Sequence, residues 1–109
     1  MTEEENYIVE VSDTEIRCHR PDGTLDSLSW KNLQRVEVVV DVGEGLPTTF
    51  FALHGPSAAL VIPEGATNAD DLSERLFELP NFDADLFVDS MSAVESKTFV
   101  CWRKEDSGS

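Results

Sequence analysis

The chain is poor in basic residues and contains no long apolar run, and each shortage excludes a class of function. Only 8 of its 109 residues are Lys or Arg, against 22 that are Asp or Glu, so the formal net charge at pH 7 is -14. Phosphate groups are bound chiefly by Lys and Arg, so this balance argues against direct binding of nucleic acid or of an anionic membrane. No apolar run approaches the roughly 20 residues that a membrane-spanning helix needs.

Histidine and cysteine are also scarce, with two of each, which argues against an enzyme or a metal protein. His54 is near Ser57, but the surrounding sequence lacks the strand-turn-helix elbow that exposes a hydrolase nucleophile. Cys18 and His19 are adjacent and would point to opposite faces of a strand, so they do not form a zinc-ligand pair. The sequence also has no glycine-rich phosphate loop. We therefore predict a non-enzymatic protein with no cofactor and no metal.

The N-terminal sequence and the cysteines bear on the cellular compartment. The first residues are acidic and lack the basic start and apolar stretch of an export signal, which predicts a cytoplasmic location. There Cys18 and Cys101 would stay reduced, and we expect both to pack as small apolar residues. A disulfide between them requires neighbouring strands, and the sequence leaves that question open.

Residues 7–62 show a period-two pattern that predicts antiparallel strands. The clearest case is a run of valines at every second position from 36 to 42, with Glu37 and Asp41 on the opposite face. Branched side chains of this kind fit a half-buried pleated sheet. Pro21-Asp22-Gly23 is a turn sequence, because proline presets its φ angle and glycine tolerates a positive one. This turn is predicted to join two antiparallel strands.

Residues 67–94 instead show helical spacing and predict two consecutive helices. Thr67 or Asn68 is expected to cap the first helix, Pro80 to end it, and Asp83 to cap the second. The expected inward-facing stripes are Ala69, Leu72, Leu76 and Leu79 on the first helix and Leu86, Phe87, Met91 and Val94 on the second.

Together these patterns predict a single α+β domain over residues 7–104, with polar tails at 1–6 and 105–109. Its sheet is an antiparallel meander of six or seven strands. The two helices pack on this sheet and precede a final strand over residues 98–103. That strand is expected to pair with the first strand or with an edge of the sheet.

The negative charge is concentrated in the helical region. Residues 64–95 contain nine acidic residues and one basic residue, Arg75. Like charges four positions apart on a helix are destabilising, and the binding of a basic partner gives such an arrangement a use. The alternative is that the acidity only keeps the protein soluble. The predicted partner-binding residues on the helices are Asp70, Asp71, Glu74, Glu78, Asp83, Asp85 and Asp89.

Trp102 is a further predicted partner-binding residue, because strand alternation places it on the face opposite to Phe99. If that face is solvated, the indole ring is an exposed aromatic of the kind that anchors interfaces. The alternative for Trp102 is packing in the core.

Several short motifs, in their order and spacing, resemble a group of small acidic bacterial proteins of uncharacterised function. The motifs span residues 21–102 and so cover most of the chain. They are Pro21-Asp22-Gly23, Trp30-x-x-Leu33-x-x-Val36, Ile62-Pro63-x-Gly65-Ala66, Leu79-Pro80-x-Phe82-Asp83, Met91 and Phe99-x-x-Trp102. The resemblance implies a soluble bacterial protein and brings no catalytic residues.

The strands followed by a helix also resemble, more distantly, bacterial pleckstrin-homology-like domains. This chain differs from them by its second helix, its final strand and its lack of the basic rim found in the lipid-binding members.

Three functions remain open at this stage. The first is an acidic protein-binding module for a basic partner, and a specific form of it is an immunity protein or inhibitor that covers the substrate cleft of a basic toxin. The second is a small-ligand or enzymatic domain with a pocket between sheet and helices, in which His19 or His54 is the polar group. The third is a self-associating structural subunit that uses an open strand edge or an exposed Trp102.

Overall fold

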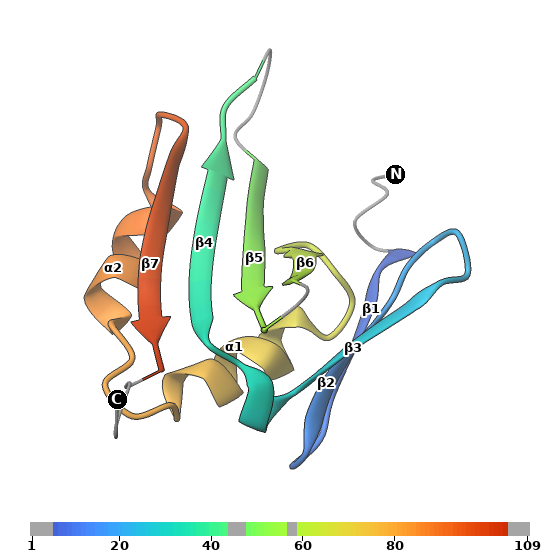
Figure 1. Ribbon diagram of the computed structural model, residues 1–109. Helices are drawn as coiled ribbons and strands as arrows, with labels where there is room; N and C mark the ends of the chain where they lie inside the picture. The colour runs from blue at the N-terminus through green and yellow to red at the C-terminus, as the bar shows by residue number, and fades with distance from the viewer. Residues whose placement is uncertain (1–5, 44–47, 57–58, 105–109) are drawn as a thin grey trace.

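The computed structural model describes residues 6–43, 48–56 and 59–104 (Figure 1). The predicted tails therefore lie outside the described residues, except for Asn6. The described residues form an α+β fold, as predicted. Its elements are β1 (Ile8–Val11), β2 (Glu15–His19), β3 (Leu25–Ser29), β4 (Arg35–Asp41), β5 (Thr48–His54), β6 (Ala59–Pro63), α1 (Ala69–Phe77), α2 (Ala84–Met91) and β7 (Lys97–Arg103).

The strands form two antiparallel sheets and not the single meander predicted from the sequence. One sheet has the order β1-β2-β3 and the other β6-β5-β4-β7. After β3 the chain enters a turn of 3-10 helix over Trp30–Asn32, where the Ser29 hydroxyl accepts a hydrogen bond from the Lys31 amide. Beyond this turn β4 pairs with β5 on one side and β7 on the other. Both edges of β4 are therefore occupied, and the final strand pairs with β4 and not with the first strand.

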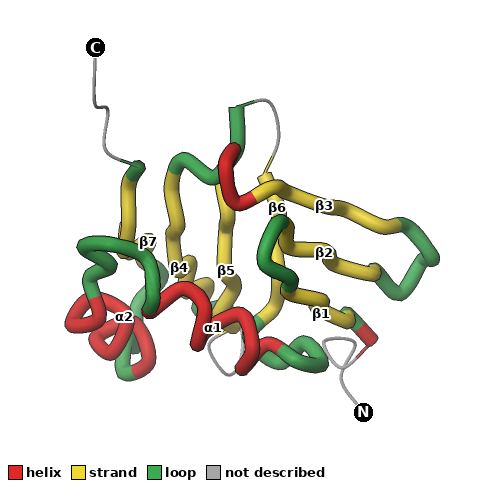
Figure 2. Tube along the Cα trace, turned by 90° about the horizontal axis from the view of Figure 1, so that it is seen from below, coloured by secondary structure: helices red, strands yellow, loops and turns green. Residues whose placement is uncertain are grey.

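Both helices lie on the same side of the four-stranded sheet (Figure 2). α2 packs against β7 and β4, α1 packs against β1, and β3 contacts β6. The two sheets therefore meet at β3 and β6, and the helices complete the core between them.

The valine pattern of β4 is confirmed, and it defines the face that the helices cover. Val36, Val38 and Val40 are each 2% exposed or less. Leu72 and Leu76 of α1 are fully buried in the same core cluster. The opposite face of β4, which carries the residues between these valines, is only partly buried.

The turn between β2 and β3 is confirmed as well. Gly23 has a φ angle of 92°, which glycine adopts without steric cost. The Asp22 carboxylate accepts hydrogen bonds from the Thr24 hydroxyl at 2.7 Å and from the Thr24 amide at 2.9 Å. These bonds hold the pKa of Asp22 below its usual value.

The inward face of α2 differs from the predicted stripe. Phe87 is buried as expected, but Met91 is 46% exposed and Val94, beyond the end of the helix, is 78% exposed. Ser90 is buried in their place, and its hydroxyl donates a hydrogen bond to the Phe87 carbonyl at 2.6 Å. This internal bond lets a polar side chain face the core. Within the described ranges, neither α1 nor α2 has the length and apolar composition needed to cross a membrane.

A β-bulge in β7 changes which of its side chains face the core. Val36 of β4 lies opposite Trp102, but the next residue, Glu37, lies opposite Val100. Cys101 is therefore an extra residue without a partner on β4. As a result, the simple alternation assumed from the sequence fails on the C-terminal side of Cys101.

The bulge turns Trp102 into the core. Its ring lies on the same side of the sheet as Phe99, because their partners on β4 are Val36 and Val38. Trp102 is 9% exposed, and its indole Nε1 donates a hydrogen bond to the Pro80 carbonyl at 2.9 Å. The prediction that Trp102 is an exposed interface aromatic is therefore wrong, and the alternative of core packing is confirmed.

Candidate functional site

The acidic residues of the helical region all lie at the surface. Because Ala69, Leu72 and Leu76 turn one side of α1 toward the core, the carboxylates at the intervening positions point outward. On α2, Asp85 and Asp89 lie one turn apart on the outer side. The exposed carboxylates are those of Asp70, Asp71, Glu74, Glu78, Asp83, Asp85 and Asp89.

Few of these charges are neutralised within the protein. Among the described residues, Glu78 is the only one of the seven that forms an ion pair, with its Oε2 3.9 Å from Arg75 Nε. The same guanidinium lies 3.5 Å from the Asp13 carboxylate and 5.3 Å from the ring centroid of Trp30. Arg75 therefore joins α1 to the β1–β2 turn and leaves the remaining acids uncompensated.

Asp83 has a structural role in addition to its charge. Its side chain caps α2 by accepting a hydrogen bond from the Leu86 amide at 3.0 Å, as the sequence predicts. Its own amide donates to the Cys101 carbonyl at 2.8 Å and so ties α2 to β7. Asn68 occupies the N-cap position of α1, but its side chain makes no capping bond there.

Large apolar side chains are exposed among these acids. On α2, Val88 is 63% exposed and Met91 46%. They lie at helical spacing beside Asp85 and Asp89, so charge and apolar surface alternate on one face. Phe77 at the end of α1 is 46% exposed. Its ring packs edge-on against that of Phe87 of α2, with the two ring centroids 5.0 Å apart. We call the seven carboxylates together with Phe77, Val88, Met91 and Val94 the acid–apolar surface.

The packing does not favour a ligand pocket between sheet and helices. Leu72 and Leu76 of α1 are fully buried in the core cluster, and neither histidine belongs to that cluster. His19 lies beside Cys18 on β2 and forms a hydrogen bond with Glu10 of β1, which lowers the pKa of Glu10. His54 lies at the end of β5 and not against the helices.

Both cysteines are buried and unpaired, as expected for small apolar core residues. Cys18 belongs to the three-stranded sheet and Cys101 to the four-stranded sheet, so their strands are not neighbours. Burial raises the pKa of Cys18, and burial together with the nearby Asp83 carboxylate raises the pKa of Cys101 to about 11. The described part of the chain also contains no group of three or more His, Cys, Asp or Glu that could hold a metal ion.

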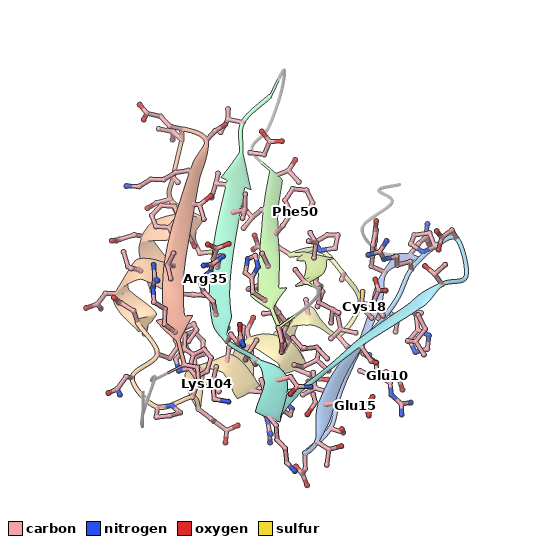
Figure 3. The ribbon with its side chains drawn as sticks, in the orientation of Figure 1. Glu10, Glu15, Cys18, Arg35, Phe50 and Lys104 are labelled. Carbon is pink, nitrogen blue, oxygen red and sulfur yellow. The ribbon has the colours of Figure 1, made fainter. Side chains whose placement is uncertain are left out.

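A second polar cluster, which sequence analysis missed, lies on the other face of the four-stranded sheet. Glu37 Oε1 is 2.6 Å from His54 Nε2, and Glu37 Oε2 is 3.2 Å from Arg35 Nε. Arg35 and Phe50 both project from the sheet face that the helices leave uncovered (Figure 3). The sequence signal was the placement of Arg35 and Glu37 out of phase with the buried valines.

Comparison with known proteins gives no relative from which a function can be carried over. No family model matches the chain, and neither the curated proteins nor the solved structures contain a significant match.

Proposed function

We propose that this chain is a bacterial cytoplasmic protein-binding module that docks onto a basic partner protein through the acid–apolar surface. The observation that carries the proposal is the exposure of Phe77, Val88, Met91 and Val94 among seven carboxylates, of which only that of Glu78 forms an ion pair with a described residue. Exposed apolar side chains gathered on one surface and rimmed by polar groups are typical of interaction sites.

The two components of this surface have different roles in binding. The carboxylates attract a basic partner over a distance and orient it, which mainly raises the association rate. The apolar side chains lose their contact with water in the complex and supply affinity that salt does not screen. A purely acidic surface would bind basic proteins of many kinds. The apolar side chains add selectivity, because they contribute to binding only when the partner's surface fits closely against them.

A specific form of this function is that of an immunity protein or inhibitor. A toxin that acts on nucleic acid carries a basic cleft, and a compact protein with a net charge of -14 complements such a cleft. The competing function is self-association, and its test is the molecular mass in solution over a wide range of protein concentration.

The experiment starts with affinity capture from a bacterial lysate at low and moderate salt, followed by binding measurements with the purified captured protein. The double variant Asp85→Asn/Asp89→Asn is expected to weaken binding about tenfold or more at low salt. Val88→Ser/Met91→Ser is expected to weaken it at both salt concentrations.

The matched control is Glu10→Gln/Glu15→Gln, which removes the same charge from the three-stranded sheet. Both residues form exposed pairs, with His19 and Arg17 respectively, and such pairs contribute little to stability. Equal effects of the control and of Asp85→Asn/Asp89→Asn would show a non-specific charge effect and refute this surface. A partner without basic character, or binding independent of salt, would refute the proposed function.

A further inference from the structure

The second polar cluster belongs to a row of nitrogen-bearing side chains that crosses three neighbouring strands. Arg35 of β4 lies directly opposite His54 of β5 on one side and directly opposite Arg103 of β7 on the other. Lys104 follows Arg103 at the end of β7. The chain has 8 basic residues against 22 acidic ones. Three of the basic residues, Arg35, Arg103 and Lys104, lie together at this end of the four-stranded sheet.

Such an arrangement is unfavourable without a counter-charge. Like charges directly opposite each other on adjacent strands destabilise the pairing. Acidic side chains are abundant in this protein, yet Glu37 is the only carboxylate of the described residues that pairs with the row. In that same part of the chain, Arg103 and Lys104 have no ion pair, although Lys104 Nζ donates a hydrogen bond to the Lys31 carbonyl at 3.0 Å.

The row borders a pocket of about 330 Å³, and none of the described residues that line it is acidic. The pocket lies where the ends of β5 and β7 meet the beginning of β4. Its lining residues are Gln34, Arg35, His54, Gly55, Arg103 and Lys104.

Backbone bonds hold this pocket in shape. The Gln34 amide donates to the His54 carbonyl at 2.8 Å, and the Lys104 amide donates to the Gln34 carbonyl at 2.8 Å. Three segments from different parts of the chain are thereby fixed to one another. Glu37 restrains the Arg35 side chain, whose Nε is buried and forms no hydrogen bond with any described residue. The backbone around the pocket and the Arg35 side chain therefore need little reorganisation to receive a ligand.

We propose that this pocket binds the oxyanion group, phosphate or carboxylate, of a small-molecule ligand. Two guanidinium groups and an ammonium group can offer the forked and charge-assisted hydrogen bonds that such oxyanions accept. The volume is at the lower end of the about 300–1,000 Å³ typical of ligand pockets, so it has room for more than the anionic group. This site is separate from the acid–apolar surface and does not depend on the proposed function.

The test is a titration of the full chain with phenyl phosphate and with benzoate, followed by backbone amide NMR at constant ionic strength. Binding is expected to shift the signals of Gln34, Gly55, Arg103 and Lys104. Phenyl phosphate carries up to two negative charges and is expected to bind more tightly than benzoate. Tighter binding of benzoate would instead assign the site to carboxylates.

Two variants separate forked recognition from simple charge. Arg103→Gln is expected to weaken phenyl phosphate binding about tenfold or more. Arg103→Lys is expected to weaken binding by less, because lysine keeps the positive charge and loses only the paired hydrogen bonds of the guanidinium group. The control is Lys97→Gln, which removes one charge from the opposite end of β7 and is expected to leave binding unchanged. The proposal is overturned if neither probe shifts these signals at about 10 mM, or if Lys97→Gln weakens binding as much as Arg103→Gln.

Discussion

Replacing Trp102 by alanine tests the bulge of β7, because only the bulge places this ring in the core. The side chain is 9% exposed and its indole Nε1 is bonded to the Pro80 carbonyl. Truncation of a buried aromatic to alanine costs about 3–5 kcal/mol, and the loss of the hydrogen bond adds about 1 kcal/mol. A small domain is stable by about 5–15 kcal/mol, so the variant should lose a large fraction of its stability.

The conservative variant Trp102→Phe separates the two contributions. It keeps most of the ring and loses the hydrogen bond, so we expect a cost of about 1–2 kcal/mol. Trp30→Phe is the matched control, since Trp30 donates an equivalent bond to the Ser12 carbonyl from a half-buried position. Its expected cost is below about 1 kcal/mol. Urea unfolding followed by far-UV circular dichroism measures all three variants.

Fluorescence gives an independent measurement, because the chain has two tryptophans. Trp30→Phe leaves Trp102 as the only tryptophan, and iodide should quench its emission weakly. Trp102→Phe leaves the more exposed Trp30, which iodide should quench more strongly. If the two variants are quenched equally, or if Trp102→Ala costs less than about 1 kcal/mol, the assignment of Trp102 to the core is refuted.

Three further predictions concern the core, a turn and a thiol. Leu76→Ala should cost about 2–5 kcal/mol because this side chain is fully buried, whereas Val88→Ala, at 63% exposure, should cost less than about 0.5 kcal/mol in the same urea assay. Gly23→Ala should cost about 1–2 kcal/mol of stability because position 23 has a φ of 92°. Gly43→Ala should be neutral or stabilising by up to about 1 kcal/mol, because position 43 needs no positive φ. Equal changes of the unfolding temperature in the two variants would contradict this. The pKa of the Cys101 thiol is raised from 9.0 to about 11, so at pH 8 this thiol should react with a disulfide reagent about 100-fold more slowly in the folded than in the unfolded chain. Mass spectrometry of the peptide that contains Cys101 measures the extent of reaction. Because the folded pKa is the higher one, the stability linked to this thiol is complete below pH 9 and is lost as the pH rises through about 11.

Elements whose local pattern agrees with their place in the fold were predictable from the sequence. The run of alternate valines forms β4 as expected, and the turn at Gly23 joins two antiparallel strands. Two features were not predictable. The strands form two sheets and not the predicted single meander because β4 pairs with β7, and these two strands are far apart in the sequence. Ser90 can be buried because its hydroxyl donates a hydrogen bond to a backbone carbonyl, and the spacing of apolar residues in the sequence does not indicate such a bond.

The same distinction applies to the candidate sites. The outward direction of Asp85 and of the acids on α1 follows from helix phase, so those residues could be named in advance. The row of His54, Arg35 and Arg103 could not, because it requires the register of three strands and the extra residue at Cys101. If Cys101 were instead paired with β4 in a regular strand, Arg103 would face the opposite side of the sheet.

The position of β7 beside β4 has a consequence for how the chain folds. The strands β1, β2 and β3 pair with one another in sequence order, so this pairing can form early from local contacts, although β1 also forms an isolated bridge with Thr67. The edge of β4 that receives β7 instead stays open until residues far along the chain arrive, and it presents an unpaired row of backbone groups on a valine-rich strand. The period before this docking is therefore when the chain is most exposed to aggregation, and association of β7 with β4 is the step that ends it.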